Sequence, residues 1–225
     1  ESDGRPYIAL ELLEGESLRA AVEGNRAGDV AQRIRIARQA AEALAYLHQR
    51  KIIHRDIKPE NIHIDRTCHA RLMDFGIAGV AGEAAALAGA TAGTPYYMSP
   101  EQVLGQPLTQ QADIYSFGVL LYELFTGIKP FNGSSVNEIF EQVLFRPVDP
   151  APLASLPEPV RAIILACTNK KLMERPATLG AVVEALVPPP AAAKSTHPLV
   201  LVVFGAVMVA IAIYAVTVLT SRYPS

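Results

Sequence analysis

Cysteine is scarce in this sequence, and its scarcity excludes several kinds of protein. The 225 residues contain two cysteines, Cys68 and Cys167. They lie far apart, have no metal-ligand spacing and do not form the disulfide framework of a small secreted domain. We therefore expect two reduced thiols in a cytosolic domain that is large enough to bury a core of its own.

An excess of either charge, an N-terminal signal segment and internal repeats are also missing. The sequence has 20 Lys and Arg residues against 22 Asp and Glu, a formal net charge of -2. No basic face is implied, so nucleic acid is not an expected partner. The first residue is Glu1 rather than Met, and we expect this N-terminus to be a cut end.

Charge is absent altogether from residues 199–219. At about 1.5 Å per residue, a helix of this length spans roughly 30 Å, the thickness of the hydrocarbon layer. A buried core helix is the alternative, but core helices rarely lack a polar face over such a length. The sequence therefore predicts one transmembrane helix, with a Pro/Ala-rich linker at 188–198 and a short tail at 220–225.

Hydrophobic periodicity predicts a mainly helical chain before this linker. Residues 7–13 have the apolar character of a buried strand, and Ser17 is placed to cap a short helix. Asp29 and Gln32 resemble a capping box, which indicates the start of a longer helix. One face of that helix is expected to carry Val30, Ile34, Ala37, Ala41 and Leu44.

Further elements follow along the chain. Residues 51–53 are typical of a short strand, and residues 62–65 and 70–73 of a hairpin. Residues 113–125 are apolar on nearly every side, which indicates a helix buried all round, and Gly127 is placed to end it.

The residues that carry chemistry are concentrated in His54–Asn61. This segment places a carboxylate at Asp56, a cation at Lys58 and an amide at Asn61. A carboxylate can accept a proton from a hydroxyl, a lysine can neutralise a phosphate, and an amide oxygen can hold Mg²⁺. A second carboxylate follows at Asp74, so the pattern indicates phosphoryl transfer.

These motifs resemble the catalytic and metal-binding loops of protein kinases. From about residue 5 to residue 187 the sequence is similar to the eukaryotic-like bacterial Ser/Thr protein kinases. The resemblance also rests on Gly93–Glu101, Asp113 and Arg175-Pro176. It implies that residues 1–187 form a kinase-like C-terminal lobe, helical with small β-hairpins, in which the N-terminal lobe is largely missing.

The resemblance assigns roles to five residues. Asp56 would accept or orient the proton of the attacking hydroxyl, and Lys58 would lie against the transferring phosphoryl group. Thr94 would help to position the acceptor, although a loop residue that stabilises a turn is the alternative. Asn61 and Asp74 would hold two Mg²⁺ ions that bridge the phosphates of ATP.

The adenine site would use four residues. Glu11 and Leu13 would meet adenine through backbone groups and Leu10 would stand behind it, although plain strand core is a compatible interpretation. His63 takes a position that is apolar in the family and packs beneath adenine, and the alternative is that it points aside. If it lies beneath adenine, ATP affinity should fall below about pH 6.5, because protonation of the imidazole costs desolvation.

Other matches are structural. Asp113 would anchor the backbone of the catalytic loop, and Glu101 would pair internally with Arg175. His54 and Phe75 would stack in a spine that links the two lobes of a kinase.

Two departures from the family bear on activity. The sequence contains no glycine-rich loop, no strand lysine and no helix glutamate to pair with it, so we expect these 225 residues alone to be inactive. Residues 78–93 are rich in Ala and Gly and are expected to form a mobile loop. There Thr91 is the candidate phosphorylation site, with Arg55 as partner of the phosphate.

The sequence thus predicts a single-pass, membrane-anchored protein Ser/Thr kinase with its kinase lobe in the cytoplasm, where ATP is. Its substrates would be Ser and Thr hydroxyls of proteins, and dimerisation is left open. A non-catalytic kinase-like module that binds partners at the membrane is the alternative for this chain. Small-molecule phosphotransferases are disfavoured by Gly93–Glu101, which resembles the shelf for a peptide hydroxyl.

Overall fold

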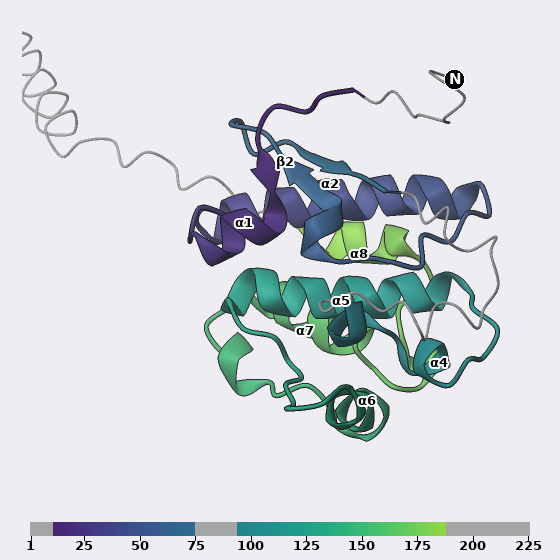
Figure 1. Cartoon of the computed structure of the whole chain (residues 1–225). Coiled ribbons are helices and arrows are strands. Elements are labelled where there is room, and N and C mark those ends of the chain that lie inside the picture. Colours follow the sequence, from purple (N-terminus) through teal and green to yellow (C-terminus); the bar gives the residue numbers. More distant parts are fainter. Residues whose placement is uncertain (1–10, 75–93, 188–225) are drawn as a thin grey trace, which may run out of the picture. The chain divides into compact units, whose positions relative to one another are not determined.

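The structure, a computed structural model, describes residues 11–74 and 94–187 (Figure 1). The predicted linker, transmembrane helix and tail lie outside the described residues, as do the loop at 78–93, Leu10 and Phe75. Within the described part, no helix has both the length and the apolar character that crossing a membrane requires.

Helices dominate the described residues, as the sequence predicted. The α-helices are α1 (Leu18–Glu23), α2 (Val30–Gln49), α4 (Pro100–Val103), α5 (Gln110–Thr126), α6 (Val136–Phe145), α7 (Glu158–Cys167) and α8 (Leu179–Ala185). Short 3-10 helices are η1 (Pro59–Asn61), η3 (Thr94–Tyr97), η4 (Ala151–Leu153) and η5 (Leu172–Glu174). The strands β1 (Glu16–Ser17), β2 (Ile62–Ile64) and β3 (Ala70–Leu72) form one antiparallel sheet in the order β1-β2-β3.

The predicted helix starts at α1 and α2 are confirmed. The Ser17 hydroxyl accepts a hydrogen bond from the Ala20 N–H, and Asp29 forms a complete capping box with Gln32. The expected apolar face of α2 is right except for Val30, which is 39% exposed because it occupies the first helical position, short of the core. The buried members of that face are Ile34, Ala37, Ala41 and Leu44.

Two predicted strands are wrong where the structure describes them. Residues 11–14 form no strand and Leu12 is 93% exposed, because no described strand pairs with them and an unpaired apolar run has no ladder to join. Residues 51–53 form a turn followed by irregular chain. Lys51 is left-handed (φ 60°), and the N–H groups of Lys51 and Ile52 bond to carbonyls in the last turn of α2.

The predicted hairpin is confirmed as β2 and β3, with His63 opposite Arg71. Its turn is fixed by Asp65, whose carboxylate accepts hydrogen bonds from the backbone and hydroxyl of Thr67 and from the His69 N–H. These bonds, led by that of the Thr67 hydroxyl, lower the pKa of Asp65 to about 2.

The core is built on α5, where every residue from Ala112 to Phe125 is buried, as predicted. It packs against α7, and α2 packs against α8 (Figure 1). A Cβ atom at Gly118 would lie 2.5 Å from the Cβ of Cys167, so the two helices meet closely there. Gly127 ends α5 in the left-handed conformation (φ 76°).

Candidate active site

Asp113 on α5 anchors the backbone of the loop at residues 54–61, called the catalytic loop below, as the resemblance implied. The two carboxylate oxygens of Asp113 accept hydrogen bonds from the backbone N–H groups of His54 and Arg55, each at 2.8 Å. Arg55 is left-handed (φ 69°), a conformation that costs free energy unless its surroundings impose it. The buried carboxylate therefore fixes the backbone immediately before Asp56.

Two predicted site residues, the catalytic Lys58 and the metal ligand Asn61, contact the side chain of Asp56. Lys58 Nζ lies 2.7 Å from Asp56 Oδ2, and the side-chain amide of Asn61 donates to the same oxygen at 3.0 Å. That amide nitrogen also donates to the backbone carbonyl of Asp56 at 2.8 Å. Asp56 is about one-third exposed while Asn61 is buried, so the carboxylate is steadied from inside and open to one side.

Asp74 is tied to the same loop through the residue before it. The Met73 N–H donates to the Asn61 carbonyl at 2.8 Å, and the Met73 carbonyl lies 3.1 Å from His54 Nε2. His54 is buried, as predicted, whereas its expected stacking partner Phe75 is outside the described residues. Asp74 itself is exposed and left-handed (φ 50°).

The donor set at Asn61 and Asp74 suits magnesium. The described hydrogen bonds of Asn61 use its amide nitrogen, which leaves the amide oxygen as the ligand atom, and Asp74 offers a carboxylate. Hard oxygen donors of this kind are those that Mg²⁺ prefers. Within residues 11–74 and 94–187, no group of three His, Cys, Asp or Glu side chains forms a different metal site.

The segment expected to receive a peptide hydroxyl begins at η3. Thr94 is the first residue of this short helix, and its side chain lies outside what the structure describes. The segment is attached to α5, since the Ser116 hydroxyl donates to the Tyr97 carbonyl at 2.6 Å. It is also attached to the catalytic loop, since the Gln102 amide donates to the Arg55 carbonyl at 2.9 Å.

The residues expected around adenine border a cavity of about 330 Å³ between residues 11–14 and the β2–β3 hairpin. Glu11, Leu13 and His63 line it, whereas Leu10 is not described. The His63 Nε2 atom lies 3.0 Å from the Glu14 carbonyl, so the imidazole is held by the backbone of that segment. Its place beneath adenine stays a prediction.

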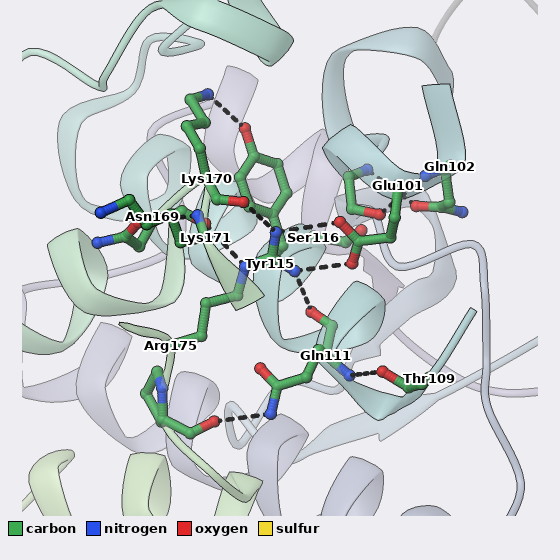
Figure 2. A network of polar contacts seen from close by, with 12 residues as sticks. Glu101, Gln102, Thr109, Gln111, Tyr115, Ser116, Asn169, Lys170, Lys171 and Arg175 are labelled. Carbon is green, nitrogen blue, oxygen red and sulfur yellow. Dashed lines mark hydrogen bonds and ion pairs between the residues drawn. The ribbon is translucent and has the colours of Figure 1, made fainter. Parts of the chain in front are cut away.

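The predicted pair of Glu101 and Arg175 is confirmed and almost wholly buried (Figure 2). The guanidinium donates to both Glu101 oxygens, at 2.7 and 3.0 Å. Its other N–H groups reach the backbone carbonyls of Asn169 and Gln111. Every charge in this pair therefore has hydrogen-bond partners, which is the condition for burying it.

The sequence profile of the protein kinase domain matches residues 1–186. The chain belongs to the protein kinase domain family. This kinase domain brings together four predicted site residues, Asp56, Lys58, Asn61 and Asp74. The first three lie in one loop, and Asp74 follows Met73, whose N–H is hydrogen-bonded to that loop.

Its relatives include bacterial kinases of one class. The serine/threonine-protein kinase PknB of Mycobacterium leprae is 40% identical over 149 residues, which cover 65% of this chain and 24% of that protein. PknB of Mycobacterium tuberculosis is 37% identical over 174 residues (76% and 28%). The serine/threonine-protein kinase PrkC of Bacillus subtilis is 36% identical over 178 residues (78% and 28%). The chain spans about a quarter of the length of these relatives.

Sequence reasoning missed two features of this kinase domain. His48 Nε2 lies 2.8 Å from Asp113 Oδ2 and supports the loop anchor from α2. A second cluster joins Arg19 to Glu60, Tyr97 and Glu123. The available signal for this cluster was Glu123, a charged residue inside the largely apolar run 113–125, because a buried carboxylate needs a partner.

Proposed function

We propose that this chain is part of a protein Ser/Thr kinase that transfers the γ-phosphoryl group of ATP to Ser and Thr hydroxyls of protein substrates. The observation that carries the proposal is the convergence of Lys58 and Asn61 on one oxygen of Asp56, with Asp74 tied to the same loop. The names of the relatives support the acceptor class.

Asp56 acts on the acceptor hydroxyl. Lys58 and Asn61 both contact Oδ2, so Oδ1 is the oxygen that receives the hydroxyl hydrogen. An ionised carboxylate in this position orients the attacking oxygen and accepts its proton as transfer proceeds. The two contacts also fix the direction of the carboxylate, which lowers the entropic cost of alignment.

Lys58 and the metal-binding pair act on the phosphoryl group. The Lys58 ammonium adjoins Asp56 and compensates negative charge that develops on the transferred group. Asn61 and Asp74 would hold Mg²⁺, which when bound neutralises charge on the ATP phosphates. Glu11 and Leu13 would meet adenine through backbone groups, Leu10 would stand behind it, and His63 would lie beneath it.

We also propose that residues 199–219 anchor this kinase in a membrane as a single-pass protein with the kinase lobe in the cytoplasm. The support comes from the sequence, which has no charged residue in this stretch. The length matches the hydrocarbon layer. Thr91 remains the proposed acceptor of a regulatory phosphate, with Arg55 as its partner.

The test is phosphotransfer to a Ser/Thr peptide by the full-length protein, including a lobe that clamps ATP. Asp56→Asn should lower kcat about a hundredfold or more and leave the melting temperature unchanged, because it removes the base but not the backbone anchor. Glu42→Gln, an exposed carboxylate on α2, is the matched control. A wild-type protein that binds ATP and transfers no phosphate would instead favour the non-catalytic module.

A further inference from the structure

Arg19 lies outside the motifs that carry the proposed function, yet it connects three segments around them. Its side chain is 15% exposed on α1. Nε donates to Glu60 at 2.9 Å, Nη1 donates to Glu123 at 2.6 Å, and Nη2 donates to the Tyr97 hydroxyl. Those partners belong to η1, α5 and η3, so one guanidinium joins the catalytic loop, the buried helix and the start of the peptide-binding segment.

The chemistry of the cluster requires a guanidinium. The Glu123 carboxylate is buried on α5, and an ionised carboxylate there is costly unless both oxygens are paired. The Tyr97 hydroxyl donates to Oε2 and Arg19 donates to Oε1. Burial opposes the charge of Arg19, but the hydrogen bonds to Glu123 and Glu60 outweigh it and raise the Arg19 pKa. A lysine has one nitrogen and lacks the planar fork that reaches three partners.

The position of the Glu60 side chain depends on its hydrogen bond with Arg19. Its Oε1 atom bonds to Arg19, and its Oε2 atom is buried with no hydrogen-bond partner within the described residues. Glu60 directly precedes Asn61, whose amide donates twice to Asp56. A displacement of Glu60 therefore moves the side chain that steadies the proposed base.

Tyr97 carries the other half of the connection. It is the last residue of η3, which begins at Thr94, and it is almost fully buried. Its hydroxyl contacts both Arg19 and Glu123, whereas its carbonyl is held by Ser116. Loss of Arg19 removes one of the contacts that fix η3 on α5.

We propose that Arg19 is a positioning residue for protein phosphorylation, which holds η1 and η3 in register on Glu123 so that an acceptor hydroxyl meets Asp56. The inference rests on the proposed function and adds a residue from α1 to it. The hydrogen bonds of Arg19 go to Glu60, Tyr97 and Glu123 rather than to Asp56, so it acts through its neighbours. Its loss should affect the peptide more than ATP.

The test compares Arg19→Met, Arg19→Lys, Glu123→Gln and the double variant Arg19→Met/Glu123→Gln in the full-length protein. Arg38→Met is the matched control, because Arg38 pairs with Glu42 on the exposed side of α2. Three quantities are measured: the melting temperature, the KM for peptide at saturating ATP, and the hydrogen exchange of the Asn61 and Tyr97 amides.

Arg19→Met should lower the melting temperature, raise the peptide KM about tenfold and speed exchange at both amides, with the KM for ATP unchanged. The double variant should recover most of the lost melting temperature, because a neutral amide replaces the buried carboxylate of Glu123. Its peptide KM should stay raised, since Glu60 remains without its partner. Arg19→Lys should also keep a raised peptide KM, and Arg38→Met should match the wild type.

Recovery of peptide KM together with melting temperature in the double variant would show that Arg19 only stabilises the fold, and would overturn the proposal. Unchanged exchange at Asn61 and Tyr97 in Arg19→Met would overturn it regardless of activity. A wild-type protein that transfers no phosphate contradicts the proposed function, and the exchange data then still decide whether Arg19 holds the two segments.

Discussion

The catalytic loop and the segment at residues 11–15 are held in very different ways. Asp113 fixes the backbone of the loop from inside α5, and Asn61 fixes Asp56 from inside the loop. Residues 11–15 rest on the hairpin through the contact of Glu14 with His63 and an exposed pair between Glu11 and Arg71. The half of the site proposed to handle the acceptor is thus preorganised by the core, whereas the half proposed for adenine is attached at the surface.

The largest expected effect comes from breaking the internal side of this comparison. Asp113→Ala removes the carboxylate that accepts hydrogen bonds from the N–H groups of His54 and Arg55. It also removes the hydrogen-bond partner of His48 Nε2. The free energy of unfolding should fall by about 3 kcal/mol and phosphotransfer should be abolished. Denaturant unfolding measures the first and a peptide assay the second.

Glu184→Ala, which removes an exposed carboxylate on α8, is the control for Asp113→Ala and should change neither quantity. An Asp113→Ala protein with wild-type stability and activity would show that the loop holds its own conformation.

A smaller effect is expected at the surface-attached side. Gly15 has φ 126°, and a Cβ there would lie 2.2 Å from the Ile64 carbonyl oxygen. Gly15→Ala should push residues 11–14 off the hairpin and weaken ATP binding by about tenfold, with little change in melting temperature. Nucleotide titration of the full-length protein measures the affinity.

Gly105→Ala is the control that separates backbone strain from the steric clash expected in Gly15→Ala. Gly105 is also left-handed (φ 63°), but a Cβ at this position would meet no described atom within 4 Å, so the substitution introduces backbone strain alone. If Gly15→Ala and Gly105→Ala bind ATP equally well, residues 11–14 do not shape the nucleotide site.

The smallest effect sharpens the picture of the core side. Lys170 donates to the Tyr115 hydroxyl at 2.8 Å (Figure 2). It also lies over the Phe131 ring. Burial, with a further contribution from the Arg175 guanidinium, lowers the pKa of Lys170 to about 7. An unfolded lysine keeps a pKa of about 10.4, so between these values the unfolded chain binds more protons. Stability should therefore rise with pH from about 7 to about 8.5, above which ionisation of the Cys167 thiol in the unfolded chain opposes the effect.

Thermal unfolding across that pH range checks the prediction. The rise should be a few degrees in the wild type and should disappear in Lys170→Met. Lys171→Met is the matched control, since the neighbouring Lys171 is exposed and paired with Glu174. A Lys170→Met protein with the same pH dependence as the wild type would contradict the assignment.

The side-chain cluster proposed for the acceptor could be expected from the sequence because its parts are local. Asp56, Lys58 and Asn61 occur within six residues, and their types and order, together with Asp74, carry the resemblance to the catalytic and metal-binding loops of protein kinases. The anchoring role of Asp113 was implied by the resemblance to the kinase family, and its two hydrogen bonds to the loop backbone confirm it.

The rest depended on contacts between distant parts of the chain. Arg19 bonds to residues 41, 78 and 104 positions away, so its partners could not be identified from the local sequence, although Glu123 in the apolar run signalled that a partner was needed. The strand expected at 51–53 failed because the last turn of α2 uses the backbone N–H groups that a sheet would need. An apolar run such as 7–13 forms a strand only where another strand pairs with it, and no described strand pairs with residues 11–13.

The close approach of α5 and α7 at Gly118 encloses one of the two cysteines and leaves the other as a selective labelling site. Cys167 is enclosed by that contact, and burial raises the pKa of its thiol to about 12, which keeps it unreactive near neutral pH. The other cysteine, Cys68, is partly exposed in the hairpin turn between Thr67 and His69, which line the cavity at residues 11–14. A thiol-reactive fluorophore added to the unmutated chain should therefore attach at Cys68 and report directly on movements of the proposed adenine site.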